Sequence, residues 1–134
     1  HARHGGRTLL FCGPGEEDTV RAIAAAAKSP VASAVDDPID LRLLKAMAKR
    51  LSLFVGTDAG PRHIAVAFDV PTVALLGSTD PRFSNTNLQH SAVVRTGVEC
   101  SPCHLKVCPI DHRCMTRMSA EMVIAACERV LAGA

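Results

Sequence analysis

The stretch LFVGTDAGPRHIA, residues 53–65, decides how the chain is organised. Its apolar start predicts a strand, and Pro61, which suits the first turn of a helix, opens a helical segment. Between them lie Asp58 and Gly60, at the point where the strand gives way to the helix. Ligands of open α/β sheets bind at such strand ends, and free amides at a helix start attract anions. The junction therefore predicts a site for a negatively charged ligand, with ordinary helix capping as the alternative.

The residues of this junction suggest separate contributions to such a site. With Gly60 near the N-cap, the amides of Arg62 and His63 are expected to lack intrahelical acceptors. Asp58 suits hydroxyl groups or backbone donors better than phosphate, because like charges repel. His63 can donate a hydrogen bond to a phosphate oxygen, and the alternative is a histidine that simply faces solvent or the core.

Strand-like and helix-like segments alternate along the rest of the chain. Strands are expected at residues 7–12, 31–35, 51–55, 72–76 and 92–95, and helices at residues 16–28, 40–50, 61–68 and from Ser119 onward. The strands are continuous apolar runs, as in sheets that are buried on both faces. The pattern predicts an α/β fold, a Rossmann-like doubly wound parallel sheet, with a cysteine-rich loop before the last helix.

Each expected helix carries an apolar stripe that should face the core. The first stripe is Val20, Ile23, Ala24 and Ala27; the second is Leu41, Leu44 and Ala48; the last is Val123, Ala126, Cys127 and Val130.

The composition narrows the class of protein. The 134 residues are 48% hydrophobic and 21% charged, which predicts one globular domain, residues 1–134. With four Phe, no Trp or Tyr and a net charge of only +2, a nucleic-acid partner is not expected. No apolar run reaches the ~20 residues of a transmembrane helix, and no signal-peptide core is present, so a cytoplasmic location is expected. HARHGG, residues 1–6, is typical of a helix end, which predicts a piece of a longer protein; residual cloning sequence is the alternative.

Two central motifs resemble one known family. DAGPRHIA (58–65) and FDVPTVALLGSTDP (68–81) are similar to the carboxyl half of the bacterial heptosyltransferases that build the lipopolysaccharide inner core, glycosyltransferase family 9. That family's pattern runs D-[ST]-G-x-x-H, G-V-P and G-P-T-D-P. CSPCHLKVCPIDHRCM (100–115) and SAEMVIAACERVL (119–131) also resemble it, so the resemblance covers essentially the whole chain.

The resemblance implies a donor-binding, carboxyl-terminal domain of a GT-B enzyme that holds a nucleotide-sugar, typically ADP-heptose. The residues it places at the donor are Thr57, Asp58, Ala59, Gly60, His63, Thr79 and Asp80. Either Glu16 or Glu17 is expected to meet the ribose hydroxyls, since a carboxylate accepts from a vicinal diol, and a favoured acidic helix start is the alternative. No cofactor is expected, because helix-start amides and basic groups can stabilise the departing diphosphate.

This chain departs from the family pattern at three points. Ala59 replaces Ser or Thr, Ser78 replaces Pro, and PRFSNTNLQH (81–90) stands where a G-P-Y-G-like stretch is usual. The family's amino-terminal acceptor domain, its catalytic base and a phosphate-binding Lys have no counterpart here, so no catalytic residue is assigned. We expect the chain alone to be inactive, with the lipopolysaccharide acceptor held by the other domain and room left for peripheral membrane contact.

The cysteines form a cluster in sequence. Cys100, Cys103, Cys108 and Cys114 have the spacing C-x2-C-x4-C-x5-C, which allows a structural zinc site, disulfides formed after purification, or free thiols. Cys12 and Cys127 are expected to act as small core residues. Residues 99–118 are expected to form a surface excursion tied to itself, apart from the binding cleft.

Two other classes of function fit parts of the sequence. One is a nucleotide-sugar epimerase of the same architecture, which would need acid–base groups in an interdomain cleft. The other is a small metal-binding or interaction module that works through the cysteine loop. Stoichiometric zinc without nucleotide binding would favour the module over the transferase.

Overall fold

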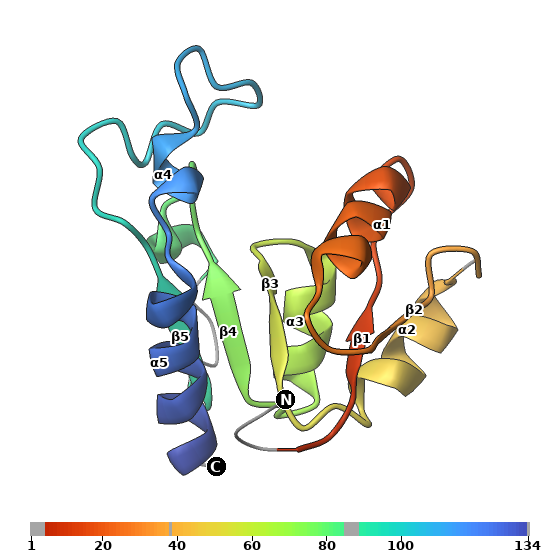
Figure 1. Ribbon diagram of the computed structural model, residues 1–134. Helices are drawn as coiled ribbons and strands as arrows, with labels where there is room; N and C mark the ends of the chain where they lie inside the picture. Colours follow the sequence, from red (N-terminus) through yellow and green to blue (C-terminus); the bar gives the residue numbers. More distant parts are fainter. Residues whose placement is uncertain (1–4, 38, 85–88, 134) are drawn as a thin grey trace. The chain divides into compact units, whose positions relative to one another are not determined.

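The computed structural model describes residues 5–37, 39–84 and 89–133 (Figure 1). The chain divides into two compact units, residues 1–43 and residues 44–134. The helix end expected at the amino terminus falls largely on residues 1–4, which lie outside the described residues.

The first unit is a small α/β unit. Strands β1 (Thr8–Leu10) and β2 (Val31–Ser33) pair in parallel, and helix α1 (Glu17–Ala26) lies between them in sequence. The stripe predicted for α1 is too wide, because Val20 is buried whereas the Ile23 side chain is 50% exposed. Two strands of three residues each offer the helix too little surface to bury the whole stripe.

Helix α2 (Leu41–Ala48) contains the boundary between the two units. Ala48 is buried as predicted, but Leu41 is exposed, so the inward face is shorter than the sequence suggests. The helix ends in a tight turn in which the Leu51 amide donates to the Ala48 carbonyl at 3.0 Å. This turn uses residues that the apolar pattern assigned to the next strand, which therefore begins at Phe54 instead of residue 51.

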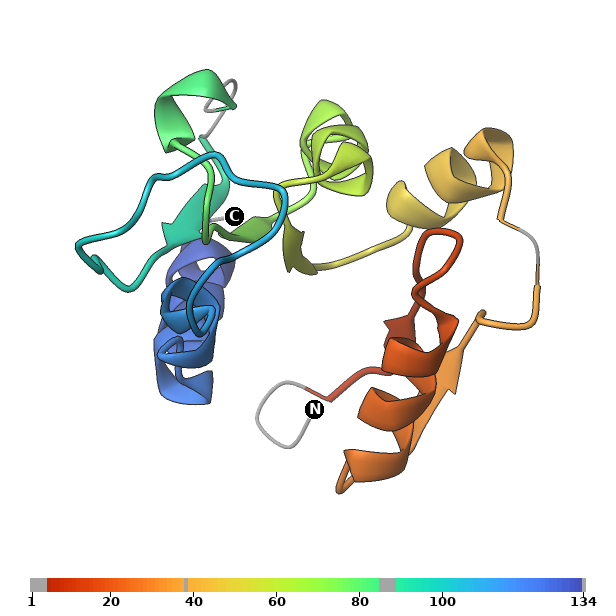
Figure 2. The ribbon, with the colours of Figure 1, turned by 90° about the horizontal axis from the view of Figure 1, so that it is seen from above.

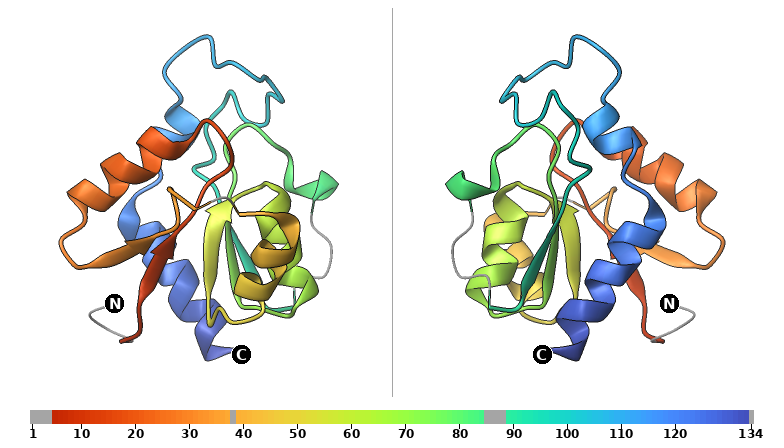
Figure 3. Two further views of the ribbon diagram at one scale, coloured as in Figure 1. Left: turned by 90° about the vertical axis from the view of Figure 1, so that its right-hand side faces the viewer. Right: turned by 90° about the vertical axis from the view of Figure 1, so that its left-hand side faces the viewer.

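The second unit is built on a three-stranded parallel sheet. Its order is β3 (Phe54–Thr57), β4 (Thr72–Leu75) and β5 (Ser91–Val94). Helices α3 (Gly60–Ala67) and α5 (Ala120–Ala132) lie on opposite faces of these strands (Figure 3). The predicted α/β fold with parallel strands covered on both faces is confirmed.

The core of the second unit forms between the sheet and α5. Val73 and Val94 of the sheet pack with Ala126 and Val130 of α5, and Cys127 packs against this cluster. The stripe predicted for the last helix is thus confirmed. Ser119 caps α5 through a hydrogen bond from the Met122 amide to its hydroxyl at 3.3 Å.

Two short helices were not predicted. The 3-10 helix η1 (Pro81–Phe83) follows β4, and α4 (Arg113–Thr116) precedes α5. Both are too short to show a hydrophobic period. No helix among the described residues has the length and apolar character needed to cross a membrane.

Candidate functional site

The turn from β3 into α3 has the expected geometry with one correction. Ala59 is the N-cap, and α3 begins at Gly60 with Pro61 in its first turn. The Arg62 amide is not free as predicted, because it donates to the Ala59 carbonyl at 3.0 Å. At Gly60, by contrast, the space that a Cβ atom would occupy is open. A ligand can therefore approach the helix start closely at Gly60.

Asp58 is held by a buried ion pair that the sequence analysis missed. Its Oδ1 lies 2.5 Å from Nη1 of Arg62, whose side chain is only 1% exposed, and 3.8 Å from Nε2 of the exposed His63. The missed signal is the four-residue spacing of Asp58 and Arg62 across a helix start, which brings the two side chains together. The guanidinium offsets the charge of Asp58, so the carboxylate no longer argues against an anion nearby.

The Asp58 carboxyl stays ionised at neutral pH. Burial raises its pKa, but the interactions with Ser84 and Arg62, together with the charge of His63, outweigh burial and lower the pKa overall. An ionised carboxylate with oxygens beside a cavity can accept hydrogen bonds from ligand hydroxyl groups.

The Asp80 side chain stabilises the start of helix η1 and does not line a ligand cavity. Its carboxylate caps η1 by accepting the Arg82 amide at 2.9 Å, and it pairs with the Arg82 guanidinium at 2.6 Å. The hydrogen bonds from Arg82 lower the pKa of Asp80 to about 2. Asp80 does not line the cavity described below, whereas its neighbour Thr79 does.

Glu16 and Glu17 lie in the first unit, at the start of α1. An oxygen of Glu16 accepts the Gly13 amide at 3.0 Å, and an oxygen of Glu17 accepts the Gly15 amide at 3.1 Å. Hydrogen bonds from its own backbone amide and from the Gly15 amide lower the pKa of Glu17. Both carboxylates thus order the loop that follows β1 and retain further acceptor capacity.

A cavity of about 350 Å³ lies at the carboxyl ends of β3 and β4. Three of the predicted donor residues line it: Thr57, Asp58 and Thr79. Ala59, Gly60 and His63 do not line it, although they belong to the same turn.

The cysteine-rich loop forms the other wall of this cavity, which corrects the prediction that it stands apart from the cleft. The lining residues from the loop and α4 are Cys100, Cys103, Leu105, Lys106, Cys108, Pro109, Ile110, His112, Arg113, Cys114 and Met115. Figure 2 shows the loop crossing above the end of β4.

Backbone hydrogen bonds dock the loop onto the end of β4. The amides of Cys103 and His104 donate to the Ser78 carbonyl at 3.1 and 2.9 Å. The Ser101 hydroxyl donates to the Gly77 carbonyl at 2.6 Å. A Cβ atom at Gly77 would lie 2.7 Å from Sδ of Met115 and 3.1 Å from Sγ of Cys114, so a larger residue would displace these α4 side chains from the strand end. The GSTDP motif therefore anchors the loop through the backbone carbonyls of Gly77 and Ser78.

Ion pairs close the loop on itself. Arg113 lies 2.5 Å from Glu99 and 3.0 Å from Asp111, measured between guanidinium nitrogen and carboxylate oxygen. The pKa of Arg113 is raised by its hydrogen bonds to these acids, and the pKa of Asp111 is lowered by the same guanidinium. The loop is thus tied to itself, as expected, but by charges and not by its cysteines.

The six cysteines are free thiols in the structure. Within residues 5–37, 39–84 and 89–133, no group of three or more His, Cys, Asp or Glu side chains is arranged to hold a metal ion. Cys108 Sγ instead accepts the His112 amide at 3.4 Å. This arrangement does not fit the tetrahedral zinc site that the spacing allowed. Cys12 and Cys127 are half-buried, and burial raises the pKa of both.

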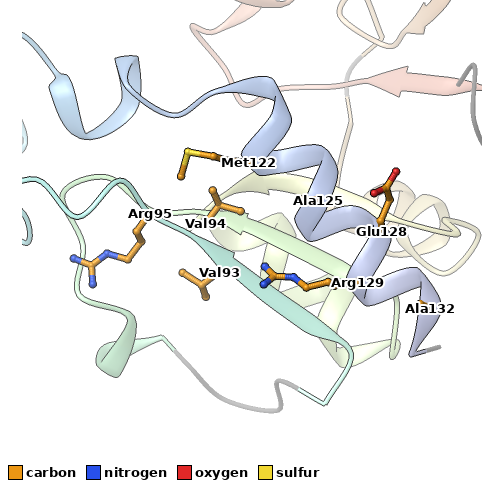
Figure 4. A pocket seen from close by; sticks show the side chains of 8 residues that line it. All are labelled: Val93, Val94, Arg95, Met122, Ala125, Glu128, Arg129 and Ala132. Carbon is orange, nitrogen blue, oxygen red and sulfur yellow. The ribbon is translucent and has the colours of Figure 1, made fainter.

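A second cavity, of about 630 Å³, lies between β5 and α5 (Figure 4). It is lined by Val93 and Val94 of β5, by Arg95 directly after that strand, and by residues of α5 that include Met122 and Arg129. None of the predicted donor residues lines it.

The second unit is an α/β unit with a parallel sheet, and its candidate site lies at the carboxyl ends of the strands, where open α/β sheets bind their ligands. Residues 1–113 match the family model "Glycosyltransferase family 9 (heptosyltransferase)", and the chain belongs to this family. The resemblance found in the sequence is confirmed.

Individual relatives agree with the family. The chain is 37% identical over 76 residues to lipooligosaccharide heptosyltransferase 2 of Campylobacter jejuni serotype O:6, covering 54% of this chain and 23% of that protein. It is 35% identical over 85 residues to lipopolysaccharide heptosyltransferase 3 of Escherichia coli, covering 62% and 25%. The chain thus spans about a quarter of the length of these curated relatives.

A solved structure shares the fold. The glycosyl transferase family 9 protein from Veillonella parvula superposes with a TM-score of 0.79 at 25% identity, covering 98% of this chain and 38% of that one.

Proposed function

We propose that this chain forms the donor-binding part of a heptosyltransferase that transfers heptose from ADP-heptose to the lipopolysaccharide inner core. Family membership and the names of the relatives support a glycosyltransferase. The observation that carries the proposal is the cavity at the ends of β3 and β4, where Thr57 and Asp58 lie beside the open start of α3.

The residues of the turn have complementary roles in this proposal. Asp58, ionised and fixed by Arg62, accepts hydrogen bonds from sugar hydroxyls. The first amide of α3 and the positive end of its dipole face the diphosphate at Gly60. His63 donates to a phosphate oxygen, and Glu16 or Glu17 accepts from the ribose hydroxyls.

Transfer breaks the bond between the sugar and the diphosphate, and negative charge develops on the leaving diphosphate. Donors that are already oriented towards that position stabilise the charge in the transition state. We assign the acceptor site and the catalytic base to the amino-terminal half of the GT-B architecture, and the reaction to the cytoplasm. The relatives named above are heptosyltransferases, which gives no support to an epimerase or to a metal-binding module.

Gly60→Ala tests this assignment. Alanine suits a helix start, and its Cβ enters open space, so the fold should be unaffected. In the full chain, ADP affinity measured by calorimetry should fall about ten-fold, because the methyl group blocks close approach to the amide. The matched control is Gly133→Ala at the end of α5, where a Cβ makes only an ordinary contact at 3.8 Å. Equal ADP affinity in both variants would refute the site.

A further inference from the structure

Most of the charge around the 350 Å³ cavity is already paired. Among its lining residues, Asp58 is paired with Arg62, and Arg113 is paired with Glu99 and Asp111. Lys106 also lines the cavity, and it makes no ion pair within the described residues. Lys106 is thus the cation of this wall that no carboxylate among the described residues holds in an ion pair.

Beside the Asp58–Arg62 ion pair, the ends of β3 and β4 offer neutral hydrogen-bonding groups. Thr57, Ser78 and Thr79 contribute hydroxyls from the ends of β3 and β4. Hydroxyl donors facing a lysine suit a phosphate group, which takes several hydrogen bonds and needs a compensating charge. An uncharged ligand would leave the ammonium without a counterpart.

We propose that Lys106 binds the diphosphate of the nucleotide-sugar, so that the cysteine-rich loop is the second wall of the donor site. The inference rests on the proposed function and adds a binding residue that lies far from the turn in sequence. The anchors of Cys103 and His104 on Ser78 hold the loop over the strand end on one side of Lys106. Arg113 with its two acids fixes the other side. A lysine suits this place because its flexible stem can follow a charge without a fixed fork geometry.

Lys106→Met in the full chain tests the role of the charge. Methionine keeps most of the apolar stem and removes the ammonium. ADP affinity should fall about ten-fold, as expected for the loss of a charge-assisted hydrogen bond. Adenosine, which has no phosphate, should bind both proteins equally. The matched control is Lys45→Met on α2, an exposed lysine that lines neither cavity and should leave ADP affinity unchanged.

Thiol alkylation tests the loop without changing its charge. Cys103 is exposed and lines the cavity, so saturating ADP should slow its reaction with iodoacetamide several-fold. Cys127, packed against the core, should react at the same rate with and without ADP.

The outcomes separate this inference from the proposed function. If the unaltered chain binds ADP but Lys106→Met binds it equally well, the role of Lys106 is refuted and the donor site stands. If ADP binds without protecting Cys103, the loop is not a wall of the site. If the unaltered chain does not bind ADP, the proposed function fails and the inference fails with it.

Discussion

The turn at residues 57–63, through Thr57 and Asp58, and the loop at residues 99–115 contribute to one cavity, yet they are held in place by different means. The turn depends on a buried ion pair between residues four apart, Asp58 and Arg62. The loop depends on hydrogen bonds to a strand end more than 20 residues away in sequence and on partly exposed ion pairs. Substitutions of exposed residues in the turn should therefore have little effect on stability, whereas breaking its buried ion pair should destabilise it. The loop should instead be destabilised by substitutions at the end of β4, where it is anchored.

Breaking the buried pair should have the largest effect. Arg62→Met leaves the Asp58 carboxylate with little access to water and no strong partner, and should lower the free energy of unfolding by about 3 kcal/mol. Urea denaturation measures this loss. Asp58→Asn in the same chain should recover part of it, because the uncompensated charge is then gone.

The control for this comparison is Arg21→Met, which removes an exposed ion pair with Asp36. The expected loss is below about 1 kcal/mol, since solvent screens such pairs. If Arg62→Met costs no more than Arg21→Met, the turn is not held by its buried pair.

A substitution at Gly77, where the loop is anchored to the end of β4, should have an intermediate effect on stability. Gly77→Ala places a Cβ against Sδ of Met115 and Sγ of Cys114, and should cost about 1–2 kcal/mol because the contact is overpacked. The loss should shrink in a chain that already carries Met115→Ala, a coupling that a double-mutant cycle measures. Additive losses would show that α4 does not rest on Gly77.

The smallest effect on stability is expected from protonation of the Asp80 carboxylate, which caps η1. Because the folded-state pKa is about 2 and the ordinary value is 3.8, the folded state binds fewer protons between these values. The stabilisation by Asp80 is thus fully present above pH 4 and is lost as pH falls towards 2. The difference in Tm between the protein and Asp80→Asn should shrink over that window, and a constant difference would contradict the cap.

The sequence predicted those parts of the fold that depend on local pattern. The alternation of apolar runs with amphipathic segments located each of the five strands found among the described residues, and the stripe of α5 predicted its buried face. The error at β3 arose because Leu51 and Leu53 continue an apolar run that hydrogen bonding divides between a helix turn and a strand. Ser52 does not mark the division, because an apolar–polar–apolar alternation is itself typical of a strand.

The candidate site was predictable only where neighbours in sequence build it. Thr57, Asp58 and Thr79 follow strands whose carboxyl ends meet at one sheet edge, so their convergence could be expected. The contribution of residues 100–115 could not, because it depends on tertiary hydrogen bonds to the carbonyls of Gly77 and Ser78, and backbone carbonyls have no sequence signature. The cysteine spacing favoured disulfides or a metal as the links within the loop, whereas ion pairs close it in the structure.

The loop leaves the sheet and returns at the same place, since the Thr96 hydroxyl donates to the Cys114 carbonyl at 3.0 Å. The residues between these two points form a loop whose two ends are both fixed near the strand ends. Lengthening such a loop raises the free-energy cost of closing it only slightly, by ~0.6 kcal/mol for each doubling of its length. The loop that forms one wall of the cavity can therefore vary in length and sequence at little cost in stability. Ligand preference can diverge among relatives through this loop, while the sheet and the turn that form the other wall keep their structure.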